Sequence, residues 1–191
     1  KEVVITGIHI ASYGKDFKEN YRLINLLEEI NKIEGIERIR LGSIEPLLIT
    51  EEFIGRLKKL EKICHHFHLS LQSGCNETLK RMNRRYTTKE YKDIVDKLRQ
   101  KMPNVAITTD VIVGFPTETE EEFLECVEYC KMVGFSKIHV FPYSKREGTK
   151  AASMEGHLPN EIKKERARRL IEIDNDLQLE YNKKFVGSKV N

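Results

Sequence analysis

Hydrogen-bonding side chains alternate with apolar ones along residues 65–74. In an extended strand, successive side chains point to opposite faces, so Phe67, Leu69 and Leu71 share one face of this stretch. The other face carries polar side chains, none of which is Lys or Glu: His66, His68, Ser70 and Gln72. Such a face is typical of a strand that lines a polar interior able to hold a ligand. A half-exposed strand of an ordinary sheet is the alternative interpretation.

A carboxylate adds to these groups. Asp110 interrupts residues 105–113, which are otherwise apolar or Thr, and a carboxylate inside a strand requires a partner or a ligand. Pairing with His66 or His68 would satisfy it without any function. His66 and His68 also have the spacing of a metal-binding pair, and together with His139 and Asp110 they would make a metal-dependent hydrolase or aldolase.

Positive charge gathers directly after the polar stretch. Residues 78–101 hold nine Lys or Arg against three acids, although the whole chain has a net charge of only +3. A basic loop that contains an aromatic residue suits a nucleic-acid backbone. The cations assigned to RNA binding are Lys80, Arg81, Arg84, Arg85 and Arg146. The alternatives are a solvated helix start, and a non-catalytic RNA-binding module.

The four cysteines do not have the spacing of a closed metal site. Cys126 and Cys130 are four residues apart, but no third Cys follows, and both continue an apolar stripe that predicts buried positions in a helix. Cys64 and Cys75 flank the polar stretch. We expect free thiols in a reducing cytoplasm.

Length and composition predict one sizeable globular domain. The chain has 191 residues, of which 39% are hydrophobic and 33% charged, and no apolar run approaches the 18 or so residues of a membrane span. It opens with Lys1 and Glu2 and continues directly into an apolar strand, which indicates a fragment of a longer protein.

Apolar periodicity predicts strict alternation of strands and helices. The strands are expected at 3–9, 38–44, 65–74, 105–113 and 137–141, and the helices at 21–33, from 51, from 88, from about 120 and at 160–184. This order predicts a parallel sheet with right-handed crossovers, as a barrel or a doubly wound layer. Gly, Pro and polar residues fall at the strand ends, which favours a barrel with its site at those ends.

Five blocks, in the same order, resemble the radical S-adenosylmethionine methylthiotransferases. They are residues 6–14, 40–46, 66–82, 109–119 and 139–149, and the resemblance covers the chain to about residue 152. The blocks Ser43-Ile44-Glu45-Pro46 and 141–146 are most similar to the branch that modifies threonylcarbamoyladenosine beside the tRNA anticodon. Thr117 stands where the family has Gly.

The resemblance implies an α/β fold, namely a partial six-stranded (β/α) barrel that lacks its first β-α unit. Residues 1–152 would form this barrel, and 153–191 a terminal helix leading toward an RNA-binding domain. The implied cofactors are S-adenosylmethionine and [4Fe–4S] clusters, whose three-cysteine loop is absent from this chain. The cofactor-binding residues would be Gly7, Ser43, Glu45, Ser70, Gln72, Asp110 and Phe141.

The implied partner is tRNA in the cytoplasm, and the implied activity is transfer of a methylthio group to a modified adenosine. No residue is assigned as the catalyst, and the chain alone is expected to be inactive. The strand at 2–8 would lack its neighbour, and an unpaired apolar edge tends to recruit another chain, so self-association is expected there.

Overall fold

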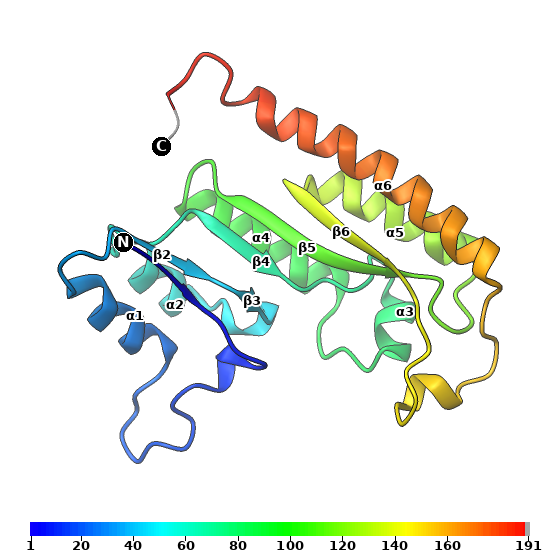
Figure 1. Ribbon diagram of the computed structural model, residues 1–191, viewed down its shortest axis with the longest axis horizontal. Coiled ribbons are helices and arrows are strands. Elements are labelled where there is room, and N and C mark those ends of the chain that lie inside the picture. The colour runs from blue at the N-terminus through cyan, green and yellow to red at the C-terminus, as the bar shows by residue number, and fades with distance from the viewer. Residues whose placement is uncertain (190–191) are drawn as a thin grey trace. The chain divides into compact units, whose positions relative to one another are not determined.

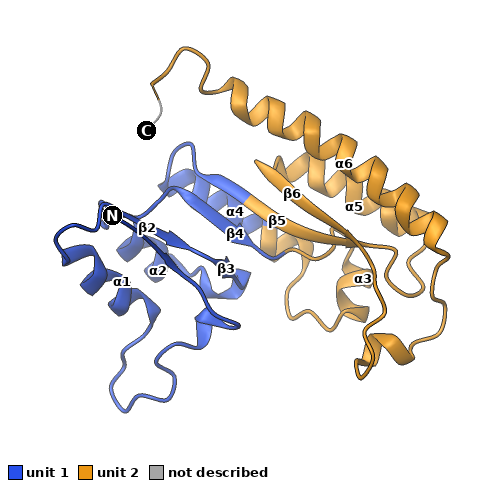
Figure 2. Cartoon of the chain, in the orientation of Figure 1, with its two compact units in different colours: residues 1–70, 92–107 blue, residues 71–91, 108–191 orange. Residues whose placement is uncertain are grey.

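The structure, a computed structural model, describes residues 1–189 (Figure 1). Its contacts divide the chain into two compact units (Figure 2). Unit 1 comprises residues 1–70 and 92–107, and unit 2 comprises 71–91 and the chain from 108 onward. Strand β5 (Ala106–Val113) and helix α4 (Thr88–Lys101) pass from one unit to the other. The strand orders are β1-β2 in one sheet and β3-β4-β5-β6 in the other.

Unit 1 contains short parallel strands covered by helices. Strand β1 (Glu2–Ile5) pairs with β2 (Arg38–Leu41), and β3 (Ser43–Ile44) pairs with β4 (His66–Leu69). The start of β5 continues this pattern, because Ala106 N donates to His65 O at 2.8 Å. The remaining elements are α1 (Leu23–Lys32), α2 (Glu51–Leu57) and the 3-10 helices η1 (Ile10–Ser12) and η2 (Pro46–Leu48). Its core includes Leu27, Ile39, Ile54, Leu57, Phe67 and Leu69.

Unit 2 places the rest of β5 parallel to β6 (Lys137–Pro142). Helix α6 (Asn160–Lys183) packs along β6 and beside α5 (Glu120–Val133), as Figure 1 shows. A short helix α3 (Asn76–Arg81) and the 3-10 helix η3 (Lys150–Ser153) complete the unit. Its core includes Tyr91, Phe123, Cys130, Phe135 and Leu170.

Side-chain caps begin the helices at the expected residues. Thr50 Oγ1 accepts from Phe53 N at 3.1 Å at the start of α2. Before α4, Glu90 accepts from Thr87 N at 2.7 Å while Thr87 Oγ1 accepts from Glu90 N at 3.2 Å. Such reciprocal bonds satisfy two backbone donors that a helix start leaves unpaired. The helix expected from residue 88 is therefore confirmed, and a capping box at residues 87–90 begins it.

A buried ion pair ties α6 to the end of β5. Glu118 and Arg166 are each only 4% exposed. Glu118 Oε2 accepts from Arg166 Nη1 and from Gly114 N, both at 2.7 Å. Burial raises the pKa of Glu118, which these two donors oppose. The pair therefore connects the turn after β5 to the first half of α6.

Some expected elements are shorter than the sequence indicated. The first strand ends at Ile5, residues 38–44 break at Gly42 into β2 and β3, and the regular part of the polar stretch is β4 alone. The segment expected to be a basic loop begins within α3, because Leu79 is buried and draws a helical turn onto the core. The division expected at residue 152 stays a prediction. Within residues 1–189, no helix has both the length and the apolarity to span a membrane.

Candidate functional site

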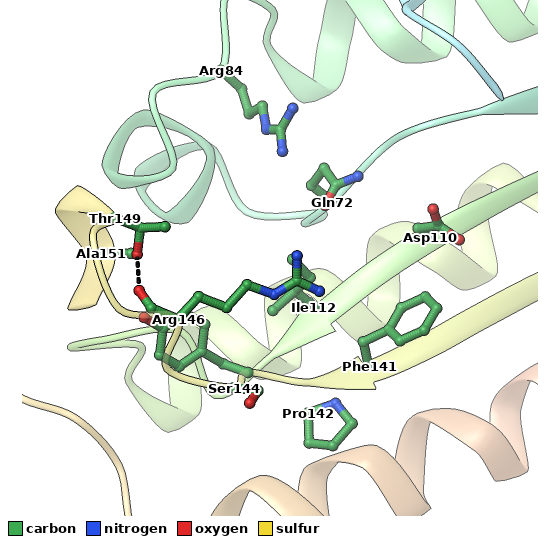
Figure 3. A pocket seen from close by; sticks show the side chains of 11 residues that line it. Gln72, Arg84, Asp110, Ile112, Phe141, Pro142, Ser144, Arg146, Thr149 and Ala151 are labelled. Atoms are coloured by element: carbon green, nitrogen blue, oxygen red, sulfur yellow. Dashed lines mark hydrogen bonds between the residues drawn. The ribbon is translucent and has the colours of Figure 1, made fainter. Parts of the chain in front are cut away.

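Unit 2 contains a cavity of about 550 Å³ at the carboxyl ends of its strands (Figure 3). Its size falls within the range of small-molecule sites. The lining comes from the segment after β4, from β5 and β6, and from the loop after β6. The lining residues are Gln72, Arg84, Asp110, Ile112, Phe141, Pro142, Tyr143, Ser144, Arg146, Thr149 and Ala151. The cavity brings together three residues assigned to the cofactor and two assigned to RNA. We call it the unit 2 pocket.

Gln72 enters the pocket from a strained backbone. Its φ is +71°, in the left-handed region that a residue with a Cβ adopts only at a cost of roughly 1–2 kcal/mol. The backbone is held there by β5: Gln72 N donates to Asp110 O and Ile112 N donates to Gln72 O, both at 2.9 Å. Strain of this kind is concentrated at functional sites.

The residues on both sides of Gln72 are anchored by side chains. Leu71 N donates to Thr109 Oγ1 at 2.9 Å, and the Tyr86 hydroxyl donates to Leu71 O at 2.9 Å. A Cβ added to Gly74 would lie 2.9 Å from the backbone of Cys126, so only glycine fits at this close approach to α5. The rigid surroundings therefore fix where the Gln72 side chain enters the pocket.

Strands β5 and β6 supply further residues that line the pocket. In their parallel register Asp110 lies opposite His139, and Ile112 lies opposite Phe141. Phe141 is 50% exposed although it is a large apolar side chain. An accessible aromatic ring beside the amide of Gln72 and the carboxylate of Asp110 suits a flat heterocycle with hydrogen-bonding edges, such as a nucleobase.

Arg84 is positioned by the way α3 ends. Arg84 N donates to Leu79 O at 2.9 Å and Asn83 N donates to Lys80 O at 3.0 Å, while Asn83 has a φ of +56°. These are the two bonds of a Schellman motif with Asn in the left-handed position. The motif turns the chain sharply, so Arg84 leaves the helix and lines the pocket.

Arg146 is positioned by a tight turn after β6. Thr149 Oγ1 donates to Arg146 O at 2.7 Å, and Gly148 supplies a φ of +79° within the turn. Figure 3 shows the Arg146 side chain directed into the pocket toward Ile112, with Arg84 and Gln72 beside it. Neither Arg84 nor Arg146 has an acidic partner among residues 1–189.

A second hollow of about 440 Å³ lies on the other side of Arg84. It is lined by Lys80, Arg84 and Arg85 among mostly polar residues of the segment 76–90. Arg81 does not line it. Its guanidinium forms an ion pair with Glu122 of α5 and lowers the pKa of that carboxyl. An RNA contact by Arg81 stays a prediction.

The predicted cofactor residues of unit 1 lie at its own strand ends. Gly7 is exposed just after β1, Ser43 and Glu45 are exposed at β3, and Ser70 is half-buried after β4. The structure joins Glu45 to His9, whose Nε2 lies 3.5 Å from Glu45 Oε1. Sequence reasoning missed His9, although its place just after the first strand was a signal. Ser144 and Thr149 were missed in the same way.

The metal-site alternative finds no support. No group of three or more His, Cys, Asp or Glu side chains within residues 1–189 is arranged to hold a metal ion. Cys126 and Cys130 are buried in α5, which confirms the prediction that they are core residues. The cysteines present therefore do not fit the three-thiolate loop of a [4Fe–4S] cluster.

Comparisons with known proteins find similar sequences along nearly the whole chain. The chain is 48% identical over 186 residues to "Threonylcarbamoyladenosine tRNA methylthiotransferase MtaB" of Bacillus subtilis (strain 168), covering 97% of this chain and 41% of that protein. It is 46% identical over 190 residues to "tRNA-2-methylthio-N(6)-dimethylallyladenosine synthase" of Thermoanaerobacter sp. (strain X514), covering 100% of this chain and 40% of that protein. The chain thus spans about two fifths of these relatives' length.

The fold is shared with a solved structure. Coproporphyrinogen III oxidase (HemN) from Escherichia coli, a radical SAM enzyme, superposes with a TM-score of 0.61 over 73% of this chain and 32% of that chain, at 18% identity. The profile of the radical SAM superfamily matches residues 1–130. The expected fold class, a partial parallel (β/α) barrel, is thereby confirmed. The chain belongs to the radical SAM superfamily.

Proposed function

We propose that this chain is the core of a tRNA methylthiotransferase, which adds a methylthio group to a modified adenosine beside the anticodon in the cytoplasm. The observation that carries the proposal is the unit 2 pocket, where strained Gln72 and exposed Phe141 lie with two arginines at the ends of parallel strands. The similarity to two tRNA-modifying proteins over nearly the whole chain supports it.

The pocket residues fit an adenosine group, so we assign them to S-adenosylmethionine. Phe141 would pack against the adenine, and Gln72 and Asp110 would hydrogen-bond its polar edges or its ribose. In unit 1, the proposed contacts are Gly7, Ser43, Glu45 and Ser70. When bound beside a reduced iron–sulfur cluster, this cofactor supplies a carbon radical. The residues described here bind and orient the cofactor.

RNA would approach along the basic segment after the polar strand. Lys80 and Arg85 line the outer hollow and are exposed, as phosphate contacts require. Arg84 lines both hollows, and Arg146 extends the positive charge to the other wall of the pocket. This continuity favours an enzyme on RNA over one whose substrate is a small neutral molecule.

Threonylcarbamoyladenosine is the proposed substrate. The blocks at residues 43–46 and 141–146 support it, as does the 48% identity to MtaB. The 46% identity to a dimethylallyladenosine enzyme is nearly as high. The nucleoside that lacks its methylthio group after gene deletion therefore decides between the two substrates.

Nucleoside mass spectrometry of tRNA tests the proposal. Deleting the gene should remove a methylthio-adenosine from tRNA and leave its unmethylthiolated precursor, whose identity reveals the substrate. The wild-type gene and Asp96→Asn, an exposed change on α4, should restore the product, whereas Asp110→Ala should not. If deletion leaves the tRNA nucleosides unchanged, the proposed function is wrong.

A further inference from the structure

The unit 2 pocket has two chemically different ends. Figure 3 shows Asp110 and Phe141 together at one end, and Arg84 and Thr149 toward the other; the Arg146 side chain extends from beside Thr149 to Ile112, so its guanidinium lies in the middle of the pocket. The first end offers a ring and a carboxylate, and the rest of the pocket, from its middle to the second end, offers two guanidinium groups. The proposed function assigns the first end to S-adenosylmethionine and leaves the second end without a specific ligand.

The two arginines approach the pocket from separate segments. Arg84 follows the Schellman turn of α3, and Arg146 lies in the Thr149-capped turn after β6. Both turns are set by backbone hydrogen bonds and by a left-handed residue, Asn83 or Gly148. Each guanidinium is therefore carried by a fixed backbone, which lowers the entropy cost of holding a ligand between them.

The charge balance of the lining selects an anion. Two guanidinium groups line the pocket, against the single carboxylate of Asp110. Arginine stays protonated, and its planar fork donates two parallel hydrogen bonds to a carboxylate or a phosphate. By contrast, an apolar substituent placed here would remove charged groups from water without compensation.

We propose that Arg84 and Arg146 form a clamp for an oxyanion of the substrate nucleotide, which makes them specificity-determining residues. This inference rests on the proposed function. A nucleotide brings such an oxyanion as its 5′-phosphate, and an N6-threonylcarbamoyl group brings another as its carboxylate. Ser144, which also lines the pocket, carries a hydroxyl group suited to the same chemistry. The clamp differs from Lys80 and Arg85, which would contact flanking phosphates.

The test is calorimetric binding to the full-length protein, because it needs no turnover. The probes are adenosine, adenosine 5′-monophosphate, N6-threonylcarbamoyladenosine nucleoside and S-adenosylhomocysteine. At least one of the two oxyanion-bearing substrate probes should bind about tenfold or more tightly than adenosine. Preference for the monophosphate identifies the phosphate as the clamped group, and preference for the threonylcarbamoyl nucleoside identifies the carboxylate.

Substitutions attribute this preference to the clamp. Arg84→Ala and Arg146→Ala should each reduce it about tenfold or more, and Arg146→Lys should restore part of it. Lys145→Ala is the matched control: it removes the same charge one residue away, does not line the pocket, and should keep the full preference. Both arginines are exposed, so unchanged circular dichroism is expected in every variant.

Three outcomes would overturn the clamp. The first is that adenosine binds the wild-type protein as tightly as both oxyanion probes do, and the second is that the preference survives in both arginine variants. The third is that the arginine variants lose as much affinity for S-adenosylhomocysteine as for the oxyanion probes. The last would assign the arginines to the cofactor. The clamp can fail while deletion of the gene still removes the methylthio-adenosine, so its failure is distinguishable from failure of the proposed function.

Discussion

Replacing Arg166 by Met should unfold this protein at a markedly lower temperature. Arg166 Nη1 donates to Glu118 Oε2 at 2.7 Å and to Glu118 O at 3.0 Å, and both residues are 4% exposed. Methionine keeps most of the volume but leaves the carboxylate with one fewer donor. Removing one partner of a buried pair costs about 3–5 kcal/mol.

The loss should depend on pH, with a sign set by Glu118. Burial already raises the pKa of this carboxyl, and loss of Arg166 raises it further. In the folded variant Glu118 therefore binds its proton more tightly than in the unfolded chain. The free energy of unfolding then falls as pH rises from the ordinary carboxyl pKa of the unfolded chain to the raised pKa of the folded variant. The deficit should therefore be larger at about pH 7 than at about pH 5.

Thermal and urea unfolding at both pH values measure this deficit. For a chain of this size, about 3–5 kcal/mol corresponds to a fall in Tm of about 6–20 °C. Arg168→Met is the control, since Arg168 is exposed on the same helix and, within residues 1–189, pairs only with surface Glu172; its change should stay below about 1 kcal/mol. The double variant Glu118→Gln/Arg166→Met should recover part of the loss. A deficit below about 1 kcal/mol, or equal at both pH values, would refute the reasoning.

Three further predictions concern other parts of the chain. The double variant Lys80→Glu/Arg85→Glu should bind tRNA more weakly, and the slope of log affinity against log salt concentration should fall by roughly one unit per lost phosphate contact. Unchanged affinity and slope would show that these two side chains are simply solvated and do not contact RNA. Val4→Lys should reduce self-association of the 191-residue chain in light scattering, because Val4 is 54% exposed on β1, whose described partner is β2 alone; a wild-type monomer at high concentration would contradict this. Gln72→Gly should leave stability unchanged or raise it by up to about 1 kcal/mol while weakening nucleoside binding, and a loss above about 2 kcal/mol would show that the left-handed backbone is not strained.

The alternation of apolar residues was sufficient to predict the order of the longer strands and helices, but not α3 or the break between β2 and β3. Phe67 and Leu69 are fully buried, as the alternation around them indicated. Asp110 was identified because a carboxylate is costly inside a strand, and it does line the pocket. These predictions succeed because burial imposes its period directly on the sequence.

Features that depend on contacts distant in sequence could not be predicted. The sequence around Arg81 does not indicate that its guanidinium pairs with Glu122, whereas Arg84, three residues later, lines a pocket. The left-handed backbone of Gln72 is equally invisible, since it is imposed by hydrogen bonds to β5. The pairing of Arg166 with Glu118 spans 48 positions and was missed for the same reason.

The central claim is that the unit 2 pocket holds the reacting nucleosides. A crystal structure of the full-length protein with S-adenosylhomocysteine and a modified adenosine nucleotide tests it most directly. We predict adenine density against Phe141 and an oxyanion between the guanidinium groups of Arg84 and Arg146. Nucleosides bound elsewhere, with only solvent between Gln72 and Arg146, would contradict the claim.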